Sequence, residues 1–136
     1  MVKLITGGKG TGKSKRMIEM ANELTKISKG HVVFIDDDKR PMYDLKYAVR
    51  FVSMDEYPVL DQKGFWGFLC GMISCDHDIE AIFIDGLIRI INTDIQSAFE
   101  FIKEINILSQ KFQIDFIISM SCAENELPAE LKEYNI

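Results

Sequence analysis

The sequence predicts an α/β fold, a three-layer sandwich in which helices cover both faces of a mostly parallel sheet. Short apolar segments alternate along the chain with segments of helical periodicity, which is typical of this class. The apolar segments lack polar alternation, as expected of strands that are buried on both faces. The 136 residues are 47% hydrophobic and contain no linker or repeat, so we expect one domain over residues 1–136.

Five short segments have the composition of buried strands. They are rich in apolar residues, many of them β-branched or aromatic, and polar or glycine-containing stretches separate them. In chain order they are Val2–Thr6, His31–Ile35, Val49–Ser53, Glu80–Asp85 and Ile114–Ser119.

Three longer segments place apolar residues at helical spacing. They are Ser14–Ser28, Asp61–Ser74 and Ile95–Phe112. The third is opened by a predicted capping box, Thr93-Asp94-Ile95-Gln96. In the second, three glycines lower the helical propensity but would let a neighbouring element approach closely, and these are Gly64, Gly67 and Gly71. A further short helix is expected after Pro128.

The net charge of −5 is distributed unevenly along the chain. Residues 1–16 contain five lysines and arginines and no acidic residue, so the remaining residues sum to −10. A local positive field beside a glycine-rich segment suits a polyphosphate ligand. The acidic remainder gives no strong nucleic-acid signal. The apolar runs are too short to span a membrane and Met1–Thr6 lacks a signal-peptide pattern, so we expect a cytoplasmic protein.

The segment after the first predicted strand matches the pattern G-x-x-x-x-G-K-[ST] at every position. Its residues are Gly7, Gly8, Lys9, Gly10, Thr11, Gly12, Lys13 and Ser14. Glycines let the backbone N–H groups turn inward, and the following helix directs its positive end at the same place. This predicts a nucleoside triphosphate site, with ATP the expected ligand, where Lys13 neutralises phosphates and Ser14 binds Mg²⁺. Lys9 is either a second phosphate contact or a solvated loop lysine.

A second acidic site is predicted at the end of a buried strand. Four apolar residues precede Asp85, and a carboxylate there would hold Mg²⁺. The alternative is a residue that caps the turn at Asp85-Gly86. Many P-loop ATPases have a water-polarising glutamate immediately after this aspartate, but Gly86 stands here. The catalytic base must therefore come from elsewhere, or hydrolysis is slow.

Two other strand ends supply candidates for the missing groups. Asp36, Asp37 and Asp38 follow the second strand, and Asp36 is the catalytic candidate that we place beside Lys13 and Asp85. A solvated acidic turn is the alternative for these three residues. Ser119, near the end of the last strand, is a candidate contact for the γ-phosphate or an ordinary strand-end serine.

The arginines and histidines carry weaker signals. Three arginines are candidates for an arginine finger toward a neighbouring subunit, and these are Arg40, Arg50 and Arg89. Arg89 lies in the apolar run Leu87–Ile91, which we interpret as core, with an interface as the alternative if it is exposed. His31 and His77 are expected to be structural or solvated.

Three stretches together resemble a known family, and they are Lys3–Met17, the strand around Phe83-Ile84-Asp85, and Leu127–Tyr134. Over its whole length the chain resembles a family of short bacterial P-loop proteins labelled ATP-binding protein or twitching motility ATPase. The resemblance implies a P-loop NTPase fold, with a RecA-like or kinase-like minimal core. It also implies nucleotide and Mg²⁺ roles for Lys13, Ser14 and Asp85, but no established reaction.

Two functions follow as hypotheses. The first is an ATP-binding protein with weak or partner-stimulated hydrolysis, where the partner is a protein or a second copy of the chain. The second is a small-molecule or nucleotide kinase, because Thr6-Gly7-Gly8 followed by Gly12-Lys13-Ser14 is similar to adenosylcobinamide kinases. A kinase needs a lid and an acceptor pocket, and Lys39–Lys63 is the stretch available for them. A nucleotide sensor that never hydrolyses differs from the first hypothesis only in rate.

Overall fold

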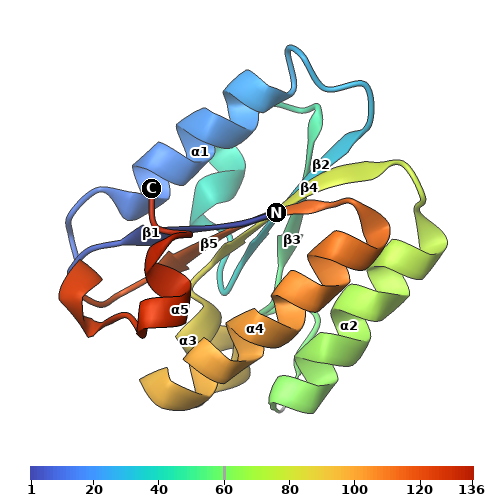
Figure 1. The fold of residues 1–136 in the computed structure, drawn as a ribbon. Helices are drawn as coiled ribbons and strands as arrows, with labels where there is room; N and C mark the ends of the chain where they lie inside the picture. Colours follow the sequence, from blue (N-terminus) through green and yellow to red (C-terminus); the bar gives the residue numbers. More distant parts are fainter. Residues whose placement is uncertain (60) are drawn as a thin grey trace.

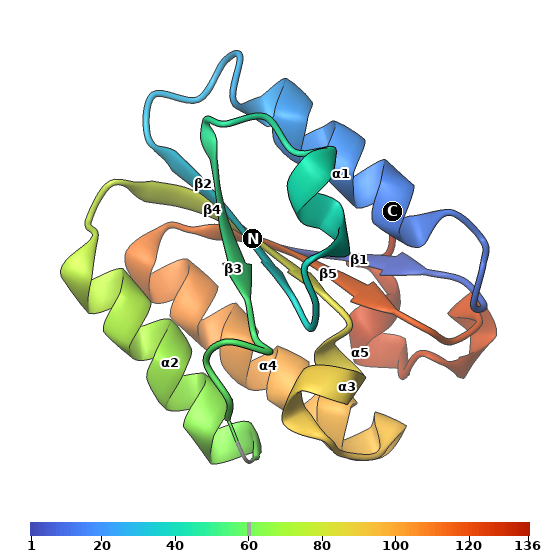
Figure 2. The same ribbon diagram turned by 180° about the vertical axis from the view of Figure 1, so that it is seen from behind.

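The computed structural model describes residues 1–59 and 61–136, so residue 60, in the predicted segment Lys39–Lys63, lies outside the described residues. Five strands form one sheet in the order β1-β5-β4-β2-β3, and every pairing between them is parallel. Helices lie on both faces of this sheet (Figures 1 and 2). The predicted α/β class is confirmed, in an arrangement compatible with a three-layer sandwich.

The strands coincide closely with the predicted segments. They are β1 (Val2–Thr6), β2 (His31–Asp36), β3 (Val49–Ser53), β4 (Ile79–Asp85) and β5 (Asp115–Met120). The α-helices are α1 (Lys13–Leu24), α2 (Gln62–Cys75), α3 (Leu87–Ile91), α4 (Ile95–Phe112) and α5 (Ala129–Lys132). Two 3₁₀ turns complete the set, η1 (Arg40–Tyr43) and η2 (Glu124–Glu126). No helix of the described residues has both the length and the apolar character that a membrane crossing requires.

The order of the strands explains why the helices form two layers. The connections through α1 and η1, from β1 to β2 and from β2 to β3, cross the sheet in one direction. The connections through α2 and through α3 and α4 cross it in the other direction. Since parallel crossovers are right-handed, α1 and η1 share one face and α2, α3 and α4 share the other. We call these the α1 face and the α4 face.

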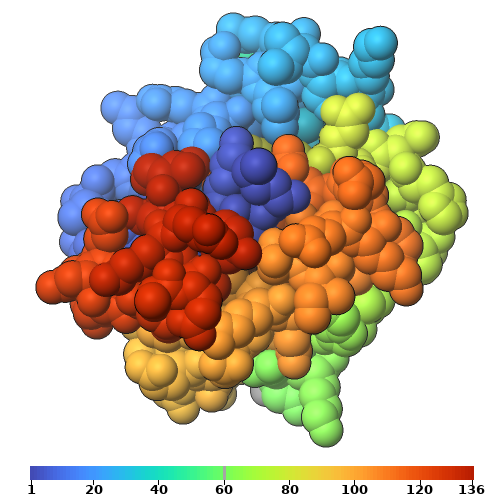
Figure 3. All heavy atoms as spheres, in the orientation of Figure 1, coloured from blue at the N-terminus to red at the C-terminus, as the bar shows by residue number. Residues whose placement is uncertain are grey.

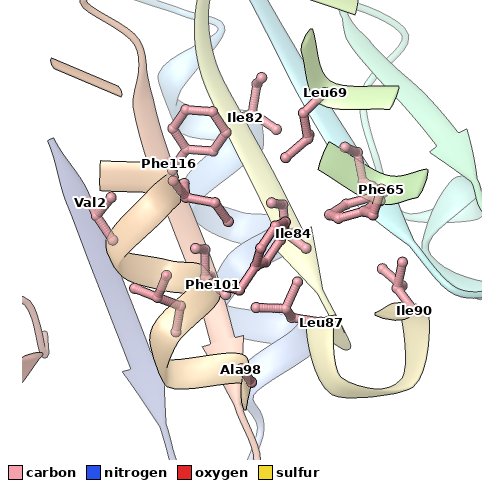
Figure 4. Close-up of a cluster of buried hydrophobic side chains, with 14 of the residues drawn as sticks. Val2, Phe65, Leu69, Ile82, Ile84, Leu87, Ile90, Ala98, Phe101 and Phe116 are labelled. Carbon is pink, nitrogen blue, oxygen red and sulfur yellow. The ribbon is translucent and has the colours of Figure 1, made fainter. Parts of the chain in front are cut away.

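Each face of the sheet has its own hydrophobic core, because alternate strand residues point to opposite sides. The larger core fills the α4 face, where Phe65, Phe101 and Leu87 pack over the strand residues Ile82 and Ile84 (Figure 4). The smaller core lies under α1. There Met17 and Ala21 cover β2 and β4, whose Phe34 and Phe83 rings stack with centroids 5.8 Å apart.

Several boundaries differ from the predictions for local reasons. Helix α1 ends at Leu24 and a hydrogen-bonded turn follows, in which the Ser28 N–H donates to the Leu24 carbonyl at 2.9 Å. Helix α4 is capped by Asp94 rather than Thr93, because the Asp94 carboxylate accepts from the Ser97 N–H at 2.7 Å. The capping residue of this helix was therefore predicted one position too early in the sequence.

Two predictions about packing have opposite outcomes. The run Leu87–Ile91 is core, as expected, because Leu87, Ile90 and Ile91 are buried while Arg89 is exposed. The close approach expected at the glycines of α2 is wrong for Gly67 and Gly71. A Cβ added at either position would meet nothing within 4 Å, so these glycines face open space.

The last residues of the chain run along the outer edge of β1. The Leu4 N–H donates to the Tyr134 carbonyl at 2.8 Å, and the Ile136 N–H donates to the Leu4 carbonyl at 2.9 Å. The Thr6 hydroxyl adds a hydrogen bond to the Asn135 side chain at 2.9 Å. Figure 3 shows the C-terminal segment, in red, against the dark-blue start of the chain. This contact fixes the strand from which the glycine-rich loop departs.

Candidate functional site

Three buried polar side chains lie in a row at the carboxyl edge of the sheet. Asp36 ends β2, Asp85 ends β4 and Ser119 lies near the end of β5, and each is no more than 5% exposed. Asp36 and Asp85 are direct partners in the pairing of β2 with β4. Side-chain alternation points all three toward the α1 face, since each lies two positions after a residue of the core under α1.

The chain leaves this edge in opposite directions from the two aspartates. After Asp36 it continues into η1 on the α1 face, and after Asp85 it continues into α3 on the α4 face. Open α/β sheets bind ligands where neighbouring strands diverge in this way, because the divergence leaves a crevice. The topology therefore selects the Asp36–Asp85 boundary as the candidate site.

The glycine-rich loop, residues 7–12, approaches this edge from β1. Gly7 has a φ of 151°, and a Cβ added there would meet the Thr11 Oγ1 at 2.5 Å. The Thr11 hydroxyl is held in that place because it donates to the Gly8 carbonyl at 2.7 Å. The Gly7 N–H is also used, since it donates to the Cys122 carbonyl at 2.9 Å. The tight curl of the loop thus requires glycine at position 7.

The ammonium group of Lys13 is bound by the carbonyl groups of the loop. Its Nζ donates to the Gly7 carbonyl at 2.9 Å and to the Gly8 carbonyl at 2.8 Å. The side chain therefore folds back over the loop, and its charge lies beside the first turn of α1. Lys9, by contrast, is exposed within the loop.

A chain of short hydrogen bonds joins the loop to the row of buried residues. The Ser14 hydroxyl donates to Asp85 Oδ2 at 2.6 Å, and the Ser119 hydroxyl donates to Asp85 Oδ1 at 2.6 Å. The Gly86 N–H in turn donates to the Ser119 oxygen at 3.2 Å. Both carboxylate oxygens of Asp85 are therefore fixed, and the groups gathered around it are oxygen atoms.

The three consecutive aspartates have separate environments, although the sequence presents them as equivalent. Arg89 donates to Asp37 through Nε at 2.7 Å and through a terminal nitrogen at 3.2 Å. Arg40 donates to Asp38 through Nε at 2.8 Å. Asp36 has no such cation and is buried, with the Asp38 N–H donating to its Oδ1 at 3.1 Å. Asp36 is thus the one of the three that belongs to the buried row.

These environments change the pKa values of the aspartates in opposite directions. Burial, together with the neighbouring carboxyl groups of Asp37 and Asp85, raises the pKa of Asp36 to about 9. Burial also acts to raise the pKa of Asp37, but the hydrogen bonds from Arg89 outweigh it and lower this pKa to about 2. The Arg40 guanidinium lowers the pKa of Asp38. At neutral pH Asp36 is therefore protonated, whereas Asp37 and Asp38 are ionised.

The structure gathers most of the predicted residues and separates a few. Lys13, Ser14, Asp36, Asp85 and Ser119 all lie at the carboxyl edge. The arginine-finger candidates Arg40 and Arg89 join them from the same chain. Arg50 does not join them, because it pairs with Asp76 at 2.9 Å beside His31, which starts β2 at the opposite edge.

Sequence reasoning missed Asn22. Its Nδ2 donates to the Asp44 carbonyl at 3.0 Å, and its Oδ1 accepts from the Lys46 N–H at 2.8 Å. These two bonds tie α1 to the chain after η1. The available signal was the spacing, since Ser14, Ile18 and Asn22 are four residues apart and share one face of α1.

Comparison with known proteins adds no further constraint. No protein-family model matches the chain, and a search of curated proteins returns no match.

Proposed function

We propose that this protein is a P-loop NTPase that binds Mg-ATP at the loop Gly7–Ser14 and hydrolyses it slowly on its own. One observation carries the proposal. Ser14 and Asp85, the two residues that the motifs assign to Mg²⁺, are 71 positions apart in sequence and are joined by a 2.6 Å hydrogen bond. A chance match to either motif would not require them to meet.

The loop fits a chain of phosphates. A curled segment without side chains at its glycines lets an anion approach the backbone, and here a Cβ would fill that curl at Gly7. Helix α1, 12 residues long, begins at Lys13 and directs its positive end at the same point. Lys13 makes its hydrogen bonds to neutral loop carbonyls, so a phosphate would offer the ammonium group a stronger, charged acceptor.

The oxygen atoms around Asp85 fit a magnesium ion. Mg²⁺ prefers carboxylate, hydroxyl, water and phosphate oxygens. Asp85 and Ser14 supply the first two types, and Ser119 holds the second oxygen of Asp85 in place. Such an ion, when bound, would neutralise charge on the β- and γ-phosphates.

The strand order favours one of the two cores that the resemblance implies. Strand β5 lies between β1, which leads into the loop, and β4, which carries Asp85. An intervening strand at this point is typical of RecA-like cores, whereas the two strands are neighbours in kinase-like cores. Ser119 on that strand then lies where it would contact the γ-phosphate.

We expect slow hydrolysis because glycine is the residue that follows Asp85. Gly86 offers no side chain to orient an attacking water, and it has a φ of 83° that favours glycine. Asp36, one strand away, is the candidate base that the sequence suggested, but its raised pKa keeps it protonated at neutral pH, so it cannot accept a proton there. We therefore propose that full turnover depends on something outside the isolated site, either a partner protein, a second copy of the chain or a second substrate.

Calorimetry with ATP, with and without Mg²⁺, tests this function. We expect ATP to bind and Mg²⁺ to tighten the binding. Adenosine, which has no phosphate groups, should compete poorly with ATP. A parallel titration with GTP measures the base preference. The absence of measurable ATP binding in the presence of Mg²⁺ would contradict the proposal.

A further inference from the structure

A cavity of about 630 Å³ opens next to the candidate site, between α1 and η1. This volume falls within the range of roughly 300–1,000 Å³ that is common for small-molecule sites. Ser14 and Asp36 belong to its lining, so the cavity begins where the glycine-rich loop ends. Figure 2 shows η1 beside α1 on this face of the sheet. We call it the α1–η1 cavity.

Hydrogen bonds and packing hold the walls of the cavity in place. One wall is the face of α1 that carries Ser14, Ile18 and Asn22. The other is η1, which is anchored by the buried ring of Pro41. Asn22 ties the two walls together through its bonds to residues 44 and 46. The cavity is thus a formed feature of the fold.

The cavity lining carries charges of both signs, with Lys15, Arg40 and Arg89 as cations and Glu19 and Asp44 as acidic residues besides Asp36. Arg40 and Arg89 both line it, and each is oriented by an aspartate that is not part of the lining. An arginine has five N–H donors. The pairing with Asp37 uses two of those of Arg89, so a planar guanidinium is held in place with donors to spare. Such a group binds carboxylates and phosphates well.

Asp36 lies where the cavity meets the nucleotide site. It is 4% exposed, it pairs in register with Asp85, and its side chain is on the α1 face. A group in the cavity therefore has Ser14 and Asp85 on one side and Asp36 beside it. Since Ser14 and Asp85 are the proposed Mg²⁺ ligands, this is the γ-phosphate end of the nucleotide site.

On the premise that the loop binds Mg-ATP, we propose that the α1–η1 cavity holds a second substrate, a small molecule with a hydroxyl group and an anionic group. Arg40 and Arg89 bind the anionic group, and the hydroxyl receives the γ-phosphoryl group. The acceptor oxygen forms a bond to the γ-phosphorus while the bond from that phosphorus to the bridging oxygen breaks. The bridging oxygen keeps the electron pair and leaves on ADP. The hydroxyl proton passes to an oxygen of the transferred phosphoryl group.

A second substrate in the α1–η1 cavity would explain why hydrolysis is slow. A phosphotransferase avoids loss of its phosphoryl group to water, and the site lacks the carboxylate that would orient water after Asp85. The cavity instead offers space and charged side chains, Arg40 and Arg89 among them, for a different nucleophile. It also supplies the acceptor pocket for which the sequence shows no obvious segment other than Lys39–Lys63.

The test compares the whole protein with two matched arginine variants. Arg40→Ala removes a cavity cation that is paired with Asp38, and Arg50→Ala removes another exposed arginine, which is paired with Asp76 at the far edge. Each protein is incubated with Mg²⁺, γ-labelled ATP and the protein-free small-molecule fraction of a cell extract. Chromatography then separates label in organic phosphates from label in inorganic phosphate. Calorimetry gives the ATP affinity of each protein.

We expect wild type and Arg50→Ala to transfer label to an organic molecule, and Arg40→Ala to do so about ten- to a hundredfold more slowly, with ATP affinity unchanged. The same fraction should raise the thermal midpoint of wild type bound to Mg²⁺ and a non-hydrolysable ATP analogue, but not that of Arg40→Ala. Label found only in inorganic phosphate, or equal transfer by Arg40→Ala, overturns this inference while leaving ATP binding intact. Absence of ATP binding by wild type would instead remove the proposed function itself.

Discussion

Asp36 and Asp85 lie opposite each other in the pairing of β2 with β4, and both side chains are buried on the α1 face. Burial is the main cause of the raised pKa of Asp36, and the neighbouring carboxyl groups of Asp37 and Asp85 raise it further. Asp85 accepts hydrogen bonds from two serine hydroxyls, whereas Asp36 accepts one from a backbone N–H. The two aspartates therefore differ in their surroundings, since hydroxyl groups fix both oxygens of Asp85 while Asp36 is protonated at neutral pH.

Replacement of Lys13 tests the loop. Lys13→Ala should weaken ATP binding by about 2–4 kcal/mol, because the phosphates lose a charged hydrogen-bond partner. Lys9→Ala is the matched control, since Lys9 is an exposed lysine of the same loop, and it should change the affinity much less. Calorimetry with Mg-ATP measures both. Equal affinities for wild type and Lys13→Ala would rule out the loop as the phosphate site.

Replacement of Asp85 tests the metal. Asp85→Asn is nearly isosteric and should leave the fold intact, but the tightening of ATP binding by Mg²⁺ should disappear. Asp38→Asn serves as the control, because its carboxylate is paired with Arg40 outside the buried row. ATP titrations at several Mg²⁺ concentrations provide the measurement. If the Mg²⁺ effect survives in Asp85→Asn, the ion is held elsewhere, and Asp36 would be examined next.

The rate of hydrolysis tests the consequence of Gly86. Without a water-orienting carboxylate, the purified protein should release phosphate at about 10⁻⁴–10⁻² s⁻¹, as P-loop proteins do when a catalytic group is missing. Steady-state phosphate release gives this rate, and a repeat at high protein concentration tests stimulation by a second copy. Turnover above about 1 s⁻¹ by the protein alone would mean that a complete hydrolytic site is already present.

The pKa of Asp36 predicts a dependence of stability on pH. In the unfolded chain an aspartate titrates near 3.9, and in the folded protein this pKa is about 9. Between these values the folded state holds more protons, so this residue lowers the stability as the pH rises, by up to about 1.4 kcal/mol per unit. Asp36→Asn should remove the effect, and its gain in stability over wild type should be larger at pH 8.5 than at pH 5.5.

Asp37→Asn is the control for that measurement, because the pKa of Asp37 is lowered to about 2. Its stabilisation is present above the unfolded value near 3.9 and is lost only as the pH falls below it. Loss of the Arg89 pair should therefore destabilise the protein by similar amounts at pH 5.5 and pH 8.5. Urea unfolding at the two pH values measures both variants. A constant effect of Asp36→Asn across this range would contradict the assigned pKa.

The strands could be predicted from the sequence, because a short apolar run between two polar turns usually forms a buried strand. The meeting of Ser14 with Asp85 followed from motif spacing and from the rule that parallel strands end at one edge. The α1–η1 cavity was not predictable, because it depends on how Asn22 bridges to residues 44 and 46 and on where η1 packs. Asp36, Asp37 and Asp38 could not be distinguished either, since their differences come from Arg40 and Arg89, which join them only in three dimensions.

The pairing of the last residues with β1 affects how copies of this chain can meet. A strand edge with unpaired N–H and C=O groups is a template for joining another sheet, and fibres grow when a molecule offers two such edges. Here residues 134–136 occupy the outer side of β1, while β3, at the other end of the sheet, pairs only with β2 among the described residues. Association through sheet edges would consequently stop at two molecules, so the tail makes any edge-to-edge assembly self-limiting.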